Sequence, residues 1–548
     1  MPTKIFSNAK ILIVEEQPLA QSYMKQSLEK LGFRQLRFAE HASSAKEQCI
    51  TEQFDLIVCS FNLSKQQDGY QLYEELRVKH LIKNSTGFIF ISAETTGSLV
   101  HSVLELQPDD FLVKPFTIYE LKTRIERILL RKHHLQKIYD LIDDGNDSKA
   151  LKEINAALDK KSNDYSAILL RLKGDALLRL KQADIAKAFF KSVLDIQKFT
   201  WAKVGLVEAL IANNEHILAQ RMLKTMLQRH ETRLIALDLL GKLEIKLNQF
   251  ELAQEFLSKA VTLAPRNLIR QKSLSHVSLV NRDYEKNYLT QRDIANFAKH
   301  SIHDHPDVYL NAARAGIDFA LTTDQSDQIQ RITRQTNKYL LDLKNQFPNS
   351  HNQAQIDVLN ARLHYLKDEH QKAKMLIEQL DEDDSMIRSV DGALDKAKAF
   401  HELGFHNKAQ SLFKQIINHC ERHPAISDPV YIKYILQQQS ECRDIKMGPK
   451  ELNNHAVTQF NHGQLNTALE AFTHAFRIMP RNSSIALNLL QCLFDSAKKD
   501  GHTLNLIIAK KCYALLSATN LDREQQQRFD KIVKLAENMQ LDLNIKSE

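Results

Sequence analysis

The sequence predicts two architectures in one chain: an α/β domain built on a parallel sheet over residues 8–130, and an all-α array of helical repeats over residues 131–537. Three observations support this prediction. The 548 residues contain only 14 glycines and 11 prolines, against average usage of roughly 7% and 5%, and so few turn-forming residues disfavour a large all-β fold. Short apolar runs alternate with amphipathic segments up to about residue 130, and amphipathic segments then recur in pairs with a period near 34.

Five short apolar runs in the first domain predict buried strands over residues 11–14, 36–39, 55–59, 88–91 and 111–113. Helices are predicted between them over residues 18–31, 43–52, 69–79 and 99–106, and a longer helix is predicted from residue 118. Pro18 opens the first helix and Gly32 follows its end, which are the usual places for these residues. Five β-α units of this size predict a doubly wound parallel sheet of the flavodoxin-like class.

Polar side chains follow four of the predicted strands. Glu15 and Glu16 come after the first strand, Ser60 after the third, Ser92 after the fourth and Lys114 after the fifth. The carboxyl ends of parallel strands meet at one edge of the sheet, and doubly wound folds carry their functional groups there. An acidic pair, hydroxyl groups and a lysine at one edge are typical of a site for a metal ion and a phosphoryl group.

With these features the first domain resembles the receiver domain of bacterial response regulators. The resemblance rests on Glu15-Glu16, Asp68-Gly69, Ser92, Phe111 and Lys114-Pro115. It implies phosphotransfer from a histidine kinase to an aspartate at the end of the third strand, with Mg²⁺ held by that aspartate and the acidic pair. It also implies that Ser92 receives a phosphoryl oxygen, that Lys114 pairs with the phosphoryl group, and that Phe111 is the aromatic switch residue that turns inward.

A serine stands at the phosphoacceptor position of this family. The Ser60 hydroxyl has no general base placed beside it by the pattern, and it does not form the acyl phosphate that a carboxylate forms. Glu15 and Glu16 stand where the family commonly has Asp, and their extra length displaces a geometrically strict ion such as Mg²⁺. We therefore expect a pseudo-receiver with weak or no Mg²⁺ binding, no other cofactor, and Lys114 paired with Glu15 or Glu16. A working phosphoswitch is the alternative.

An alanine marks the start of the second helix in seven predicted repeats. The positions are Ala150, Ala186, Ala219, Ala253, Ala373, Ala409 and Ala468. Together with bulky residues four positions later, and with Pro265 and Pro480, this spacing resembles the tetratricopeptide repeat. Residues 268–345 and 425–448 match the pattern more weakly. Nine to eleven helix pairs are expected in all, followed by a frayed tail over residues 538–548.

Helix pairs of this kind stack because no single pair buries its own apolar face. The resemblance implies a right-handed superhelix with a concave groove that binds a peptide or a protein. Asn454 and Asn488 fall at groove-facing positions of adjacent repeats and are candidates for hydrogen bonds to a ligand backbone. The competing interpretation is that both are solvated polar side chains.

Composition and motifs narrow the class of function. The net charge of +7 is spread thinly along the chain, which makes a nucleic-acid-binding regulator the less favoured alternative. The six cysteines form no CxxC pair, so free thiols in a reducing compartment are expected. Apolar runs are too short for a signal peptide or a membrane-spanning helix, which predicts a cytoplasmic protein. The GxSxG, HExxH, P-loop and GxGxxG motifs do not occur, and no enzymatic activity is expected.

The hypothesis from the sequence is a non-enzymatic signalling adaptor of a bacterial two-component or phosphorelay system. The receiver domain would bind a sensor histidine kinase or another receiver-containing protein near its first and fourth helices, and the repeats would hold a second partner. A phosphorylation-dependent response regulator, with the repeats as its output, is the alternative.

Overall fold

The computed structural model describes residues 6–63, 67–160, 164–380, 389–424, 428–446, 449–500, 505–519 and 521–538. The chain forms two compact units. One comprises Met1–Ser273 and Asn296–Asp304, and the other comprises Leu274–Ala295 and His305–Glu548. The predicted frayed tail, apart from its first residue, lies outside the described residues.

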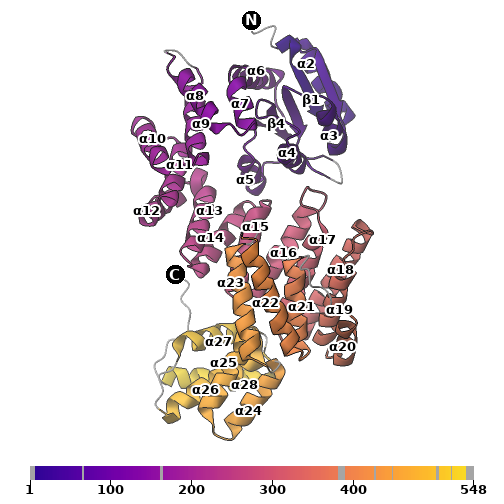
Figure 1. Ribbon diagram of the computed structural model, residues 1–548, viewed down its shortest axis with the longest axis vertical. Helices are drawn as coiled ribbons and strands as arrows, with labels where there is room; N and C mark the ends of the chain where they lie inside the picture. The colour runs from indigo at the N-terminus through magenta and orange to yellow at the C-terminus, as the bar shows by residue number, and fades with distance from the viewer. Residues whose placement is uncertain are drawn as a thin grey trace. The chain divides into compact units, whose positions relative to one another are not determined.

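The first unit begins with a parallel sheet, which contains the labelled strands β1 and β4 of Figure 1. The order of its strands is β2-β1-β3-β4-β5. Its strands are β1 (Lys10–Val14), β2 (Gln35–Ala39), β3 (Leu56–Ser60), β4 (Gly87–Ser92) and β5 (Asp110–Val113). The order confirms the predicted doubly wound fold, whose topological switch point lies between β1 and β3. The third strand starts one residue later than predicted and ends on Ser60. Asp55, just before it, accepts a hydrogen bond from the backbone nitrogen of Lys10 at 2.8 Å, at the opposite end of the sheet from Ser60.

Helices cover both faces of this sheet. The helices α2 (Pro18–Lys30) and α6 (Ile118–His134) pack on one face, and α3 (Ala42–Thr51), α4 (Gly69–Val78) and α5 (Gly97–Glu105) pack on the other. Every residue of β3 and β4 is buried, although successive side chains point to opposite faces. This explains why both strands read as continuous apolar runs.

The rest of the described chain is helical, as predicted. The helices up to residue 298 are α7 (Gln136–Asp143), α8 (Asp147–Leu158), α9 (Ser166–Arg179), α10 (Ala183–Ile196), α11 (Thr200–Ala212), α12 (His216–Leu227), α13 (His230–Lys246), α14 (Phe250–Leu263), α15 (Leu268–Val280) and α16 (Tyr284–Ala298). The later ones are α17 (Pro306–Ala320), α18 (Ser326–Gln346), α19 (Gln353–Leu366), α20 (His370–Glu378), α21 (Val390–Glu402), α22 (His406–Arg422), α23 (Pro429–Asp444), α24 (Pro449–Asn461), α25 (Leu465–Ile478), α26 (Ser483–Asp500), α27 (Leu506–Ala518) and α28 (Arg523–Asn538).

The seven marker alanines occupy one structural position. Each is fully buried and is the fourth residue of its helix. Two residues before each of these helices the backbone has a positive φ, which makes the same tight turn in every pair. The residues with this φ are Gly145, Lys181, Asn214, Asn248, Asp368, Gly404 and Gly463. The spacing of the alanines therefore identified seven repeats that are built alike.

The pair α15–α16 has the same turn, with Arg282 at the positive φ, although its sequence pattern is weak. At the marker position it has the buried Asn287 instead of alanine. The Ser275 hydroxyl donates to Asn287 Oδ1 at 2.7 Å, and Gln291 Nε2 donates to the same hydroxyl at 2.8 Å. A hydrogen-bonded cluster thus replaces the apolar contact in this repeat, and apolar periodicity does not detect such a cluster.

Candidate functional site

The structure brings the predicted site residues to one edge of the sheet. Strand pairing places Ser60, at the end of β3, beside Ile91, and Ser92 follows at the end of β4. Glu15 and Ser60 are each 7% exposed, and Ser92 is 3% exposed. Glu16, in contrast, is exposed to solvent. The edge therefore contains one buried carboxylate and two buried hydroxyl groups.

Lys114 forms an ion pair with Glu15 across this edge. Its Nζ lies 2.9 Å from Glu15 Oε2, and the other carboxylate oxygen of Glu15 accepts the backbone N–H of Gln17 at 3.2 Å. The sequence did not decide whether Glu15 or Glu16 pairs with Lys114. In the structure the partner of Lys114 is Glu15. The lysine that would otherwise meet a phosphoryl group is held by a carboxylate of the same chain.

The two remaining switch residues are also engaged within the domain. The Ser92 hydroxyl accepts the backbone N–H of Glu94 at 3.0 Å and lies 3.1 Å from the carbonyl oxygen of the same residue. Phe111 is partly buried against the apolar cluster of the α3–α4–α5 face. The side chains of Ser92 and Phe111 thus both contact groups of the receiver domain itself.

The turn after Ser60 is closely packed. A Cβ atom at Gly69 would lie 2.6 Å from the carbonyl oxygen of Ser60, so only glycine fits at the start of α4. Asp68 caps this helix, since its side chain accepts the N–H of Gln71 while the Gln71 side chain accepts the N–H of Asp68. Both residues of the Asp68-Gly69 pair thus hold the backbone beside Ser60.

The residues at this edge do not fit the Mg²⁺ ion of the family. Mg²⁺ requires near-ideal octahedral oxygen ligands and usually one or two free carboxylates. Here the buried carboxylate of Glu15 already neutralises Lys114. The position of the family's phosphoacceptor aspartate, the third carboxylate, holds the neutral hydroxyl of Ser60. Among the described residues, no group of three or more His, Cys, Asp or Glu side chains is placed to hold a metal ion.

The predicted groove residues Asn454 and Asn488 lie in the second unit. Asn488 of α26 donates to Asn453 Oδ1 at 3.2 Å, and its own Oδ1 accepts from Arg528 at 2.9 Å. Asn454 of α24 is exposed instead. The neighbour of Asn488 is therefore Asn453, because residues one apart on a helix point about 100° away from each other. Arg528, which binds Asn488, is a contact that the repeat pattern did not indicate.

A buried cluster of charges connects three successive helix pairs of the second unit. The first helices of three successive pairs, α17, α19 and α21, share a buried cluster of charges centred on Arg362. Lys398 of this cluster lies 5.3 Å from the ring centre of Tyr434 in α23, so α23 packs against the charged cluster. The first helices of these three pairs are thus joined by charged side chains, a feature that the repeat pattern did not indicate.

The fold and the edge of the sheet define the class: a receiver domain followed by tetratricopeptide-like repeats. Residues 11–126 match the model of the response regulator receiver domain, and residues 235–267 match the tetratricopeptide repeat. A 176-residue segment is 33% identical to the transcriptional activator protein IrlR of Burkholderia pseudomallei, and it covers 31% of this chain and 74% of IrlR. The chain therefore belongs to the response regulator family through its receiver domain.

Two further matches cover the same domain. The probable chemotaxis protein CheY of Rhizobium etli is 28% identical over 124 residues, which are 23% of this chain and 95% of that protein. The solved receiver domain of the Francisella response regulator 1452 is 27% identical; the match covers 23% of this chain and 98% of that one, with a TM-score of 0.21. The receiver and the repeats together make this a two-component signalling protein. Within the described part of the chain, no helix has the length and apolar character needed to cross a membrane.

Proposed function

We propose that the chain is a non-enzymatic cytoplasmic adaptor of a two-component system, which binds a sensor histidine kinase or another receiver-containing protein without being phosphorylated itself. The Lys114–Glu15 ion pair carries this proposal, because it satisfies the switch lysine inside the domain while a serine replaces the acceptor. No Mg²⁺ or other cofactor is part of the proposal. The repeats would hold a second partner.

The α2 helix is the best surface for the first partner. Leu19 is 86% exposed and Tyr23, one helical turn later, is 47% exposed. Two large apolar side chains on one face of a short helix favour protein binding. We expect Leu19→Asp in the full-length chain to abolish capture of a kinase or receiver protein from cells that naturally contain this chain.

The matched control is Ile196→Asp, because Ile196 in the repeats is as exposed as Leu19, at 89%. It should leave the capture of that partner unchanged. Capture that yields no signalling protein, or equal loss with both substitutions, would contradict the adaptor proposal.

The phosphorylation-dependent alternative makes the opposite prediction about covalent chemistry. We expect no phosphoryl adduct on the full-length chain after incubation with acetyl phosphate and Mg²⁺, because the Ser60 hydroxyl has no adjacent base and Lys114 is already paired. Intact-protein mass spectrometry measures this, with a phosphorylatable receiver in parallel as the positive control. A stoichiometric adduct would favour a response regulator whose repeats are the output.

A further inference from the structure

Two arginines that follow Pro265 bind the receiver within the first unit. Arg266 forms an ion pair with Asp68, the cap of α4. Its guanidinium carbon also lies 5.3 Å from the ring centre of Phe61 and 5.4 Å from that of Tyr70. A planar guanidinium can pair with a carboxylate and stack on aromatic rings at the same time, which a lysine cannot do as well. Arg266 thus contacts side chains on both sides of the turn that follows Ser60.

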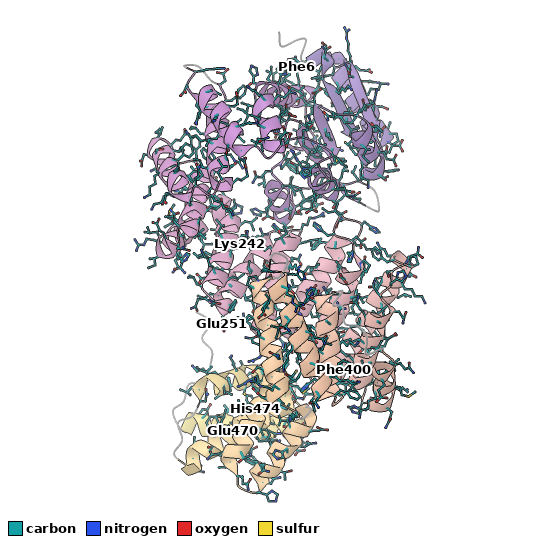
Figure 2. All side chains as sticks on the ribbon, in the orientation of Figure 1. Phe6, Lys242, Glu251, Phe400, Glu470 and His474 are labelled. Atoms are coloured by element: carbon teal, nitrogen blue, oxygen red, sulfur yellow. The ribbon has the colours of Figure 1, made fainter. Side chains whose placement is uncertain are left out.

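Arg270 of α15 makes the second connection and is only 3% exposed. It forms an ion pair with Glu105 at the end of α5, donates from Nε to Asp238 of α13 at 2.9 Å, and donates to the Ala264 carbonyl at 3.2 Å. Lys242, labelled in Figure 2, also pairs with Asp238, at 2.8 Å. Two cations therefore balance two carboxylates at the junction between α5 and the repeats, where Arg270 is buried and Lys242 is exposed.

Weaker contacts surround these two ion pairs. Gln71 of α4 donates to the carbonyl of Lys299 at 3.1 Å. The imidazole of His303 lies 3.2 Å from the Glu74 carboxylate. The rings of His101 in α5 and His230 in α13 are 5.4 Å apart. Both α4 and α5 are thus in contact with residues of the repeat region.

We propose that Arg266 and Arg270 form a clasp that keeps the α4–α5 face of the receiver docked on the repeats constitutively. The docking depends on cations supplied by the chain and on no phosphoryl group. The clasp covers the α4–α5 face and leaves the exposed face of α2 to partners. The sequence predicted a docking surface near the first and fourth helices of the receiver, which are α2 and α5. With α5 covered by the clasp, α2 alone remains as that surface.

A cross-linking experiment on the full-length chain tests the clasp. Cysteines introduced as His101→Cys and His230→Cys should be joined rapidly by a short bismaleimide, while the six native cysteines are buried. Adding Arg266→Ala and Arg270→Ala should slow the cross-link by about tenfold or more, because each leaves a carboxylate without its partner. The control is Lys259→Ala, an exposed lysine paired with Glu255 inside α14, and it should change nothing.

Asp68→Asn refines the test, because asparagine keeps the helix cap but loses the negative charge. We expect it to slow the cross-link less than Arg266→Ala. Hydrogen exchange of β1 and β3 should stay as slow as in the parent in all these variants.

An unchanged cross-linking rate in the arginine variants would overturn the clasp. So would loss of protection in β1 and β3, since the arginines would then serve the receiver's own folding. If acetyl phosphate and Mg²⁺ changed the cross-linking rate of the parent, the docking would not be constitutive.

Discussion

Phe190→Ala should lower the free energy of unfolding of the repeat region by about 3–5 kcal/mol. The Phe190 ring is 1% exposed and lies between two helices, α9 and α11. A Cβ atom at Gly174 or at Gly205 would overlap this ring, so the helices approach it through glycines from two sides. Removing the ring leaves a cavity that two rigid helix backbones cannot close, which places the cost at the upper end of core substitutions.

The only tryptophan of the chain reports this change directly. Trp201 lies 6.3 Å from Phe190, ring centre to ring centre, in an edge-to-face arrangement. Urea denaturation followed by tryptophan fluorescence therefore measures the unfolding of this part of the repeats. Phe189→Ala is the control, since the adjacent ring is only partly buried and should cost clearly less.

A double substitution tests whether steric overlap with the Phe190 ring is the reason that position 205 requires glycine. Gly205→Ala alone should be destabilising by about 1–3 kcal/mol, because its methyl group meets the Phe190 ring. In the Phe190→Ala background the overlap is gone, and alanine should then stabilise the helix by up to about 1 kcal/mol. Additive effects of the two substitutions would contradict this account.

Contacts between residues close in sequence, or at repeating positions, could be predicted from the sequence. The seven marker alanines gave the register of the repeats, and the residues at the strand ends gave the edge of the sheet. The repeat pattern was weak where a polar residue occupies the position of a marker alanine. Asn287 is the example, and it is hydrogen-bonded to Ser275. The contact between Asn488 and Asn453 could not be predicted either, because the repeat pattern does not specify which of two adjacent polar residues faces the next helix pair.

The clasp could not be predicted for another reason. Arg266 lies 198 residues from Asp68, and Arg270 lies 165 residues from Glu105. Neither pair has a spacing that any local period would produce, and a single arginine after a proline is an ordinary sequence feature. Such charge pairing depends on where the repeats of the first unit place the residues after Pro265 against the receiver, and this is set by the sum of many small packing angles.

Arg362→Met should lower the free energy of unfolding of the second unit by about 3–5 kcal/mol at pH 7. Arg362 is 2% exposed and binds three carboxylates: Asp395 and Glu402, each at 2.6 Å, and Asp318 at 2.9 Å. The nearest other cations are Lys398, 2.6 Å from Asp318, and Arg314, 3.8 Å from Asp395. Without the guanidinium, buried negative charges are left without enough compensation, although methionine fills much of the volume.

The pH dependence follows from two carboxyl groups. Burial alone would raise the pKa of Asp318, but Lys398 and Arg362 outweigh burial and hold it below its usual 3.8. Ionised Asp318 therefore stabilises the fold fully above pH 3.8, and this contribution is lost as the pH falls through the folded pKa. Burial raises the pKa of Glu402 above 4.5 despite the attraction of Arg362. In the variant both pKa values should rise, since each group loses a cation.

The difference in free energy of unfolding between the parent and Arg362→Met should therefore become smaller as the pH is lowered from about 8 to about 5. The carboxyl groups that have lost Arg362 take up protons over this range. Urea denaturation followed by circular dichroism at several pH values measures it. The control is Arg443→Met, whose 68% exposed side chain pairs with the exposed Asp444 and should contribute less than about 0.5 kcal/mol. A difference in free energy of unfolding that stays constant with pH would mean that Arg362→Met destabilises the unit through lost packing and not through uncompensated negative charge.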